Sequence, residues 1–237
     1  MVGRIHSFQS LGTLDGPGIR AVVFMQGCPL RCVCCHNPDT WDSGAGEEIS
    51  VSELLKKITR LRSYFGSYGG VTVSGGEPLM QASFVAEFFE ACKGIGINTA
   101  LDTSGCIYND DVERLLEATD TVLLDYKYTN DADYQRYVGM NRKKVEDFLE
   151  ILEEKKKSVW IRQVIIPTLN DTEESVLRLY ELQKKYSCIE RIELLPFRKL
   201  CLEKYEFAGI EFKLRDLPEA SLELIARLEA LKNNFTE

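Results

Sequence analysis

Short apolar runs and amphipathic stretches alternate along the whole chain. The apolar runs are rich in β-branched residues and each gives way to glycine or polar residues, which predicts about six β-strands. We expect these strands at residues 21–26, 71–74, 98–103, 121–126, 159–166 and 191–197. The amphipathic stretches carry apolar residues at three- and four-residue spacing, which predicts helices between the strands. The expected helices span residues 52–65, 82–93, 110–118, 143–155, 172–186 and 219–232.

The alternation of strands and helices predicts a parallel sheet with right-handed crossovers. A closed eight-stranded barrel needs more repeats than the chain contains, so we expect an α/β fold built as a partial (β/α)6 barrel, TIM-like but open. Ser52 and Thr172 are the expected N-caps of their helices, and Pro218 is expected to open the last helix. No linker interrupts the pattern, so residues 1–237 should form a single domain with a C-terminal helix at about 218–234 packed on it.

Charge and composition narrow the possible functions. The chain has 29 Lys and Arg against 37 Asp and Glu, a net charge of -8, so it presents no general basic field to a nucleic-acid backbone. No apolar run is long enough to span a bilayer, and the first residues lack the apolar core of a secretory signal. We therefore expect a cytoplasmic protein that binds neither nucleic acid nor membrane. The two histidines, His6 and His36, are too few for a multi-histidine metal site within one chain.

The eight cysteines fall into two sets. Cys28, Cys32 and Cys35 form a C-x3-C-x2-C pattern, and three such thiolates can ligate three irons of a [4Fe-4S] cluster while the fourth iron stays open to a substrate. Two other interpretations remain: zinc bound by these thiols together with Cys34, and cysteines that simply lie in the core. The other set is scattered singly and is expected to be buried filler; it comprises Cys92, Cys106, Cys188 and Cys201.

Motifs around the cysteines resemble those of a known family. They are DGPGIR at 15–20, QGCPLRC at 26–32, CHNPDTW at 35–41, SGGE at 74–77, LDT at 101–103, LDYK at 124–127, WIR at 160–162 and IELLP at 192–196. Together, and in this order, they are similar to the radical S-adenosylmethionine activating enzymes of glycyl radical enzymes. The resemblance extends over nearly the whole chain and implies a partial barrel of the radical SAM type.

The resemblance implies a reaction and a set of site residues. In the family, the amino and carboxylate groups of S-adenosylmethionine bind the open iron, and reductive cleavage yields a 5'-deoxyadenosyl radical that takes a hydrogen from a partner's glycine. Cys28, Cys32 and Cys35 match the catalytic cluster ligands. The other matching positions are expected to bind the cofactor: Cys34, His36, Gly75, Gly76, Glu77, Asp125, Tyr126, Lys127, Tyr128, Thr129, Arg162 and Arg198.

Several of these positions have plainer interpretations, which the sequence leaves open. Gly75-Gly76 can simply form a turn, and Asp125 with Lys127 can form a surface ion pair. Arg162 can belong to a structural salt bridge, and His36 can be a polar loop residue.

The resemblance also implies a monovalent-cation site beside the cofactor. Asp102, Thr103, the Leu123 carbonyl and Asp125 match its ligands, and oxygen ligands of this kind suit a hard cation. The alternative is that the two aspartates cap nearby helices.

Three positions depart from the family pattern. Cys34 stands where the family usually has an aromatic residue near the adenine, so it offers less stacking area and an additional thiol. Arg198 replaces a frequent histidine and brings a permanent cation, and Cys201 replaces a frequent glycine.

The expected partner is a glycyl radical enzyme of the formate-lyase type. Many relatives acting on other partners carry a ferredoxin-like insertion with further clusters, and residues 42–47 lead directly to the next expected helix instead. We expect a monomer that takes electrons from a donor such as flavodoxin or ferredoxin. The alternatives are a radical SAM enzyme acting on a different glycyl enzyme, a small molecule or a nucleoside, and a non-catalytic electron carrier or zinc-stabilised scaffold.

Overall fold

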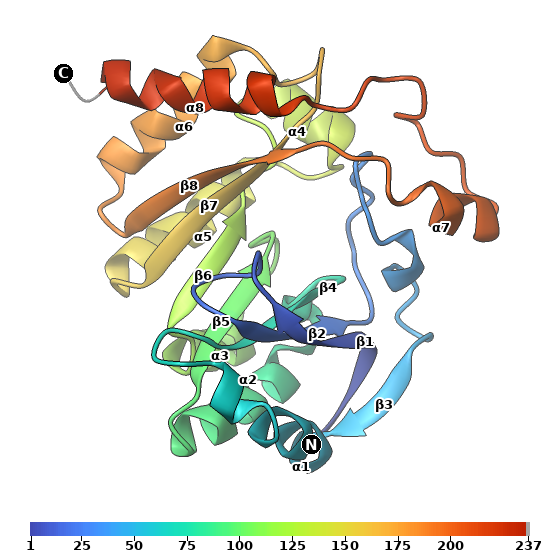
Figure 1. Ribbon diagram of the computed structural model, residues 1–237, viewed down its shortest axis with the longest axis vertical. Coiled ribbons are helices and arrows are strands. Elements are labelled where there is room, and N and C mark those ends of the chain that lie inside the picture. Colours follow the sequence, from blue (N-terminus) through green and yellow to red (C-terminus); the bar gives the residue numbers. More distant parts are fainter. Residues whose placement is uncertain (236–237) are drawn as a thin grey trace. The chain divides into compact units, whose positions relative to one another are not determined.

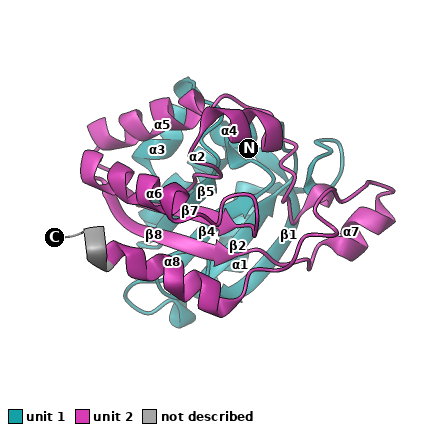
Figure 2. Cartoon of the chain, turned by 90° about the horizontal axis from the view of Figure 1, so that it is seen from above, with its two compact units in different colours: residues 1–29, 40–123 teal, residues 30–39, 124–237 magenta. Residues whose placement is uncertain are grey.

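The computed structural model describes residues 1–235 (Figure 1). The chain divides into two compact units (Figure 2). Unit 1 comprises residues 1–29 and 40–123, and unit 2 comprises residues 30–39 and the chain from residue 124 onward. The division passes through the cysteine-rich segment, so Cys28 belongs to unit 1, whereas Cys32, Cys34 and Cys35 belong to unit 2.

Unit 1 is a sheet covered by helices. Its strands are β1 (Val2–Gly12), β2 (Arg20–Met25), β3 (Glu47–Ser50), β4 (Gly70–Gly75) and β5 (Asn98–Thr103). They lie in the order β3-β1-β2-β4-β5 in the sheet. The next strand is β6 (Thr121–Asp125), within which the unit ends. The pairs β2-β4 and β4-β5 are parallel, while β1 runs antiparallel to both β2 and β3. Its helices are α1 (Val51–Thr59), α2 (Ala82–Gly94) and α3 (Asp110–Glu117), with short 3-10 turns at Arg62–Tyr64 and Pro78–Gln81.

The core of unit 1 follows from its apolar pattern. Val23, Val73 and Leu101 lie side by side on three adjacent strands, and Phe88 and Leu115 come from α2 and α3. All five side chains are buried. Burial of this apolar surface supplies the main favourable free energy of folding.

Unit 2 continues from β6 to β7 (Ser158–Ile165) and β8 (Ile189–Pro196), and β7 and β8 are parallel. Its helices are α4 (Asp131–Tyr137), α5 (Lys143–Glu154), α6 (Glu173–Lys185), α7 (Leu202–Phe207) and α8 (Leu222–Phe235). The last helix contacts α6 and β8. A further 3-10 turn, Pro38–Thr40, ends the cysteine-rich segment.

The strand order gives an open, mostly parallel sheet, which confirms the predicted α/β fold with a partial barrel. All six predicted strands occur close to their expected bounds, and Thr172 is the N-cap of α6 as predicted, since its side chain accepts a hydrogen bond from the Ser175 N–H. Within residues 1–235, no helix combines the length and apolar character that crossing a bilayer requires.

Two predicted helix starts are wrong. Ser50, not Ser52, caps α1, because its hydroxyl accepts from the Glu53 N–H while the Glu53 carboxylate accepts from the Ser50 N–H. This reciprocal pair stabilises the first turn. The last helix begins at Leu222, after Pro218, and the Ser221 hydroxyl accepts from the Leu224 N–H there.

Candidate active site

Backbone hydrogen bonds hold the cysteine-rich segment of unit 2. The Cys35 N–H donates to the Cys32 carbonyl at 3.1 Å, so a tight turn links these two thiols. The Val33 N–H donates to the carbonyl of Tyr137 at 2.9 Å, which fastens the turn to the end of α4. Helix α4 was not expected from the sequence pattern, although Asn130 caps it by accepting from the Asp133 N–H.

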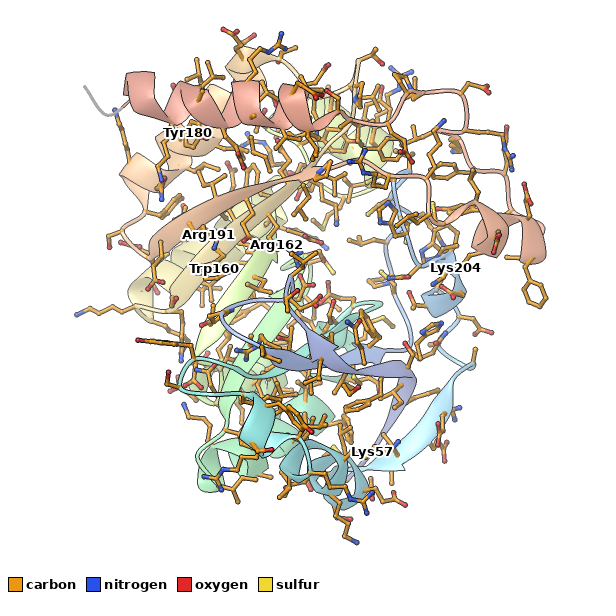
Figure 3. The ribbon with its side chains drawn as sticks, viewed as in Figure 1. Lys57, Trp160, Arg162, Tyr180, Arg191 and Lys204 are labelled. Carbon is orange, nitrogen blue, oxygen red and sulfur yellow. The ribbon has the colours of Figure 1, made fainter. Side chains whose placement is uncertain are left out.

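A second set of contacts holds the residues that follow Cys35, and it comes from the far end of the chain. The Tyr205 hydroxyl of α7 donates to the Cys35 carbonyl at 3.1 Å. The His36 Nε2 atom lies 2.8 Å from the Arg198 carbonyl oxygen. Burial lowers the pKa of this imidazole. Lys204, labelled in Figure 3, donates to the Asn37 side chain at 2.8 Å. Residues of unit 2 thus hold Cys35 and the two residues that follow it by hydrogen bonds.

In unit 1, the GGE segment supports the backbone that leads to Cys28. The Gly76 N–H donates to the Met25 carbonyl at 2.9 Å, and the Glu77 N–H donates to the Gly27 carbonyl at 2.8 Å. A Cβ atom at Gly76 would lie 2.2 Å from the Gly27 oxygen, and Gly75 has a φ of 109°, so both positions require glycine. The two glycines therefore allow the ends of β2 and β4 to approach closely.

The Glu77 carboxylate is buried in unit 1 and accepts hydrogen bonds on both oxygens. Oε1 accepts from the Thr103 hydroxyl at 2.5 Å and from the Leu79 N–H at 3.1 Å. Oε2 accepts from the Ser104 N–H at 3.0 Å and from the Ser104 hydroxyl. Glu77 therefore ties the loop after β4 to the end of β5, which is a structural role in addition to any contact with a cofactor.

The DGPGIR segment is held by a buried arginine. Arg20 donates to the Thr72 hydroxyl at 2.6 Å, to the Val71 carbonyl at 2.6 Å and to the Pro17 carbonyl at 3.0 Å. The Thr72 hydroxyl donates in turn to the carbonyl of Asp15 at 2.6 Å. Burial lowers the pKa of Arg20 to about 10, so it remains a cation at neutral pH. Arg20 and Thr72 together fix the backbone of the loop that precedes β2.

At the end of β6, Asp125 and Lys127 form an ion pair at 2.7 Å in unit 2. Burial lowers the pKa of Lys127, but the negative charges of Asp125, Cys32 and Cys34 outweigh this effect and raise it well above its usual value. Burial raises the pKa of the Cys34 thiol to about 11. Lys127 is therefore a permanent cation close to the cysteine segment.

The three residues around Lys127 on this loop differ in their hydrogen bonding. The Tyr126 hydroxyl accepts from Arg142 at 3.0 Å and lies 3.3 Å from the Glu146 carboxylate. The Thr129 hydroxyl is buried 3.0 Å from the Ser175 hydroxyl. The Tyr128 hydroxyl is buried and has no hydrogen-bond partner among the described residues.

Arg162 on β7 and Arg198 after β8 both contact acidic residues of unit 2. Arg162 is mostly buried and lies 3.5 Å from Glu193, which also pairs with Arg191 at 3.1 Å. Figure 3 shows Arg162 on β7 and Arg191 on the neighbouring strand β8. The Arg198 guanidinium donates to the Ala220 carbonyl at 2.7 Å and lies 3.6 Å from Glu219. Structural ion pairs therefore account for contacts of both arginines.

The residues matched to the cation site are divided between the two units. Asp102 accepts from the Ser74 hydroxyl at 2.7 Å, and Thr103 donates to Glu77, both in unit 1. Asp125 pairs with Lys127 in unit 2. In the part of the chain from residue 1 to 235, no group of three or more His, Cys, Asp or Glu side chains is placed to hold a single metal ion. The cation site stays a prediction.

The donor set of the cysteine segment suits an iron–sulfur cluster. Three thiols separated by three and two residues supply the ligands that such clusters use, and the scattered cysteines are all buried. Within unit 2, a backbone hydrogen bond links Cys32 and Cys35, and the cation of Lys127 interacts electrostatically with Cys32 and Cys34.

Comparisons with known proteins identify the family of the chain. The model of the Radical SAM superfamily matches residues 22–181. Pyruvate formate-lyase-activating enzyme of Clostridium pasteurianum is 46% identical over 238 residues, covering 100% of both chains. The chain belongs to the radical SAM superfamily, in the family of pyruvate formate-lyase-activating enzymes. Pyruvate formate-lyase 1-activating enzyme of Escherichia coli K12 is 42% identical and covers 99% of this chain and 97% of its own.

Membership in the radical SAM superfamily implies a [4Fe-4S] cluster and S-adenosylmethionine. Solved structures show the same fold at low identity. Streptococcus suis SuiB bound to its precursor peptide SuiA is 15% identical with a TM-score of 0.71, and the match covers 90% of this chain but 45% of SuiB. A domain of pyruvate-formate lyase-activating enzyme from Bacteroides vulgatus is 21% identical with a TM-score of 0.58, covering 71% of this chain and 95% of that domain.

Proposed function

We propose that this chain activates a glycyl radical enzyme of the pyruvate formate-lyase type. One electron, delivered through a [4Fe-4S] cluster, cleaves a carbon–sulfur bond of S-adenosylmethionine to give methionine and a 5'-deoxyadenosyl radical. This radical takes a hydrogen atom from a glycine Cα of the partner, which leaves 5'-deoxyadenosine and a glycyl radical. The observation that carries the proposal is the 46% identity over the full length of both chains with an enzyme of that name.

Cys28, Cys32 and Cys35 are proposed to hold three irons of the cluster and to leave the fourth for S-adenosylmethionine. The backbone of this chain supports two of these ligands directly, because Cys32 and Cys35 close one turn and the Tyr205 hydroxyl binds the Cys35 carbonyl. Cys34 is proposed to lie beside the cofactor without ligating iron.

The residues after β6 and β4 are proposed to bind S-adenosylmethionine. Lys127 is a partly buried cation and suits the carboxylate of the methionine part, while Asp125 fixes the direction of the Lys127 ammonium group. Gly75 and Gly76 are proposed to let the ligand approach their backbone, because neither carries a side chain. The remaining residues proposed for the cofactor pocket are His36, Glu77, Tyr126, Tyr128, Thr129, Arg162 and Arg198.

We further propose a monovalent cation held by Asp102, Thr103 and Asp125, because hard cations favour oxygen ligands. The electron donor is proposed to be a one-electron carrier such as flavodoxin or ferredoxin, and the chain to act as a cytoplasmic monomer.

The test is cofactor cleavage that depends on the cluster and a radical that depends on the partner. The anaerobically loaded and reduced protein should release 5'-deoxyadenosine from S-adenosylmethionine. With pyruvate formate-lyase present, a glycyl radical should accumulate on that enzyme. Cys35→Ala serves as the control and should do neither. Cleavage without any partner radical would leave a radical SAM enzyme but contradict the proposed substrate.

A further inference from the structure

Tyr128 carries a buried hydroxyl for which the described residues provide no hydrogen bond. Tyr128 is 1% exposed, and no described residue offers its hydroxyl oxygen a hydrogen bond. Buried hydroxyls are normally paired, because burial removes the hydrogen bonds that water would supply. An unpaired hydroxyl beside a proposed cofactor site indicates that its partner belongs to the cofactor.

Two neighbouring tyrosine hydroxyls have hydrogen-bond partners, in contrast to the Tyr128 hydroxyl. Tyr126 interacts with Arg142 through its hydroxyl. The Tyr134 hydroxyl accepts from the Lys127 N–H at 3.4 Å and donates to the Asp125 carbonyl at 3.5 Å. Tyr126 and Tyr134 therefore both have hydroxyl partners, whereas the described residues provide none for Tyr128.

Tyr128 packs against Tyr137, a residue that holds the segment that carries the cysteines. Its ring centroid is 5.2 Å from that of Tyr137, and the Tyr137 carbonyl accepts from the Val33 N–H, between Cys32 and Cys34. Burial raises the pKa of Tyr128, and the charges of the Cys34 and Cys32 thiols raise it further. The hydroxyl is thus within the field of these thiols and keeps a proton to donate.

We propose that the Tyr128 hydroxyl donates a hydrogen bond to a sulfur atom of the cluster held by Cys32 and Cys35, and that this bond raises the cluster's reduction potential. Reduction adds negative charge to the sulfurs, so a donated hydrogen bond stabilises the reduced state more than the oxidised state. Tyr128 is in this sense a tuning residue and takes no part in the bond-breaking step. The inference rests on the proposed function only in requiring the cluster.

The test is Tyr128→Phe in the cluster-loaded protein, measured without S-adenosylmethionine or partner. Iron and sulfide per chain should match the unaltered protein. In a redox titration followed by electron paramagnetic resonance, the ratio of reduced to oxidised cluster at a fixed potential should fall about tenfold, which corresponds to a midpoint about 59 mV more negative. The matched control is Tyr134→Phe, which removes a buried hydroxyl bonded to backbone instead, and its midpoint should not change.

A second variant keeps the test decisive if Tyr128→Phe loads its cluster poorly. Placing 3,5-difluorotyrosine at position 128 keeps the ring and makes the hydroxyl a stronger donor, so the midpoint should move in the opposite direction, to a more positive value. An unchanged midpoint in either loaded variant would overturn the proposal. So would equal shifts in the Tyr128 and Tyr134 variants, because the hydroxyl would then act through general packing.

A vibrational readout tests the bond itself. Iron–sulfur stretching bands of the loaded protein should shift on transfer to D2O, and part of that shift should be missing in Tyr128→Phe. These measurements do not involve glycyl radical formation. Failure to activate a partner would therefore contradict the proposed function but not this inference. An unaltered midpoint potential in an active Tyr128→Phe variant would contradict this inference alone.

Discussion

Replacing Glu77 by Gln should destabilise the chain even in the absence of S-adenosylmethionine. The buried carboxylate accepts from two backbone N–H groups, of Leu79 and Ser104, and from two hydroxyls. The hydroxyls can turn to accept from an amide, but the backbone N–H groups cannot. Whichever oxygen becomes the NH2 group, one backbone N–H is left facing a donor.

The magnitude follows from these four bonds. A buried N–H without a partner costs roughly 1–3 kcal/mol, and each bond that loses a charged acceptor becomes weaker, from about 1.5–3 kcal/mol toward about 1 kcal/mol. The lower ends of these ranges sum to a loss of about 3 kcal/mol in the free energy of unfolding. Since domains are typically stable by roughly 5–15 kcal/mol, such a loss is easily measured.

The assay is anaerobic urea denaturation of the cluster-loaded protein, with and without S-adenosylmethionine. Glu87→Gln on α2 is the matched control, because the Glu87 carboxylate is partly exposed and pairs with the N-terminal amine at 3.0 Å. Exposed pairs contribute about 0–1 kcal/mol, so this variant should unfold close to the unaltered protein.

The opposite result would refute the structural role of Glu77. Suppose that, without S-adenosylmethionine, the free energy of unfolding of Glu77→Gln lies within about 0.5 kcal/mol of that of the unaltered protein. The four hydrogen bonds would then not contribute the stated free energy. Weaker binding of S-adenosylmethionine alone would then show that Glu77 serves the ligand only.

Three further predictions concern the site. Cys35→Ala should lose the cluster while Cys34→Ala retains it, as iron and sulfide analysis of each variant will show; the reverse pattern would shift the ligand assignment by one residue. Lys127→Met should weaken binding of S-adenosylmethionine about tenfold or more, because the carboxylate loses a partly buried cation, with iron content unchanged; equal affinity in a titration would leave Lys127 a structural partner of Asp125. Arg198→Ala should lower the free energy of unfolding by about 1 kcal/mol, because its bond to the Ala220 carbonyl is lost. A large loss of cofactor affinity at full stability would instead place the guanidinium at the ligand.

Local pattern predicted the parallel strands because each of them combines an apolar run with a clear end. It failed for β1, whose sequence RIHSFQS mixes polar and apolar residues, since this strand runs antiparallel between β2 and β3 and keeps many side chains exposed. It also failed for α4 and α7, which are only seven and six residues long and carry too few turns to show a helical period.

Contacts between distant parts of the chain account for the rest of what the sequence did not show. Tyr205 and Lys204 hold the residues after Cys35, yet they lie 170 and 167 positions from their partners Cys35 and Asn37. No local signal marks such residues. Glu77 shows a different limit, because its motif indicated a ligand contact while its burial and four donors give it a structural role as well.

The buried Arg20 shows a similar limit within the DGPGIR motif. The motif contributed to the family resemblance, but the sequence could not show that this arginine binds the backbone of its own loop and of β4. An arginine at the start of an apolar strand has no local feature that distinguishes a buried anchor from a ligand contact.

The most direct test of the proposed function is the origin of the hydrogen atom in 5'-deoxyadenosine. Pyruvate formate-lyase labelled with deuterium at the glycine Cα would be incubated anaerobically with the reduced protein and S-adenosylmethionine. We predict 5'-deoxyadenosine that carries one deuterium, together with a glycyl radical whose resonance lacks the splitting from the Cα hydrogen. Unlabelled 5'-deoxyadenosine with no radical on the partner would contradict the account.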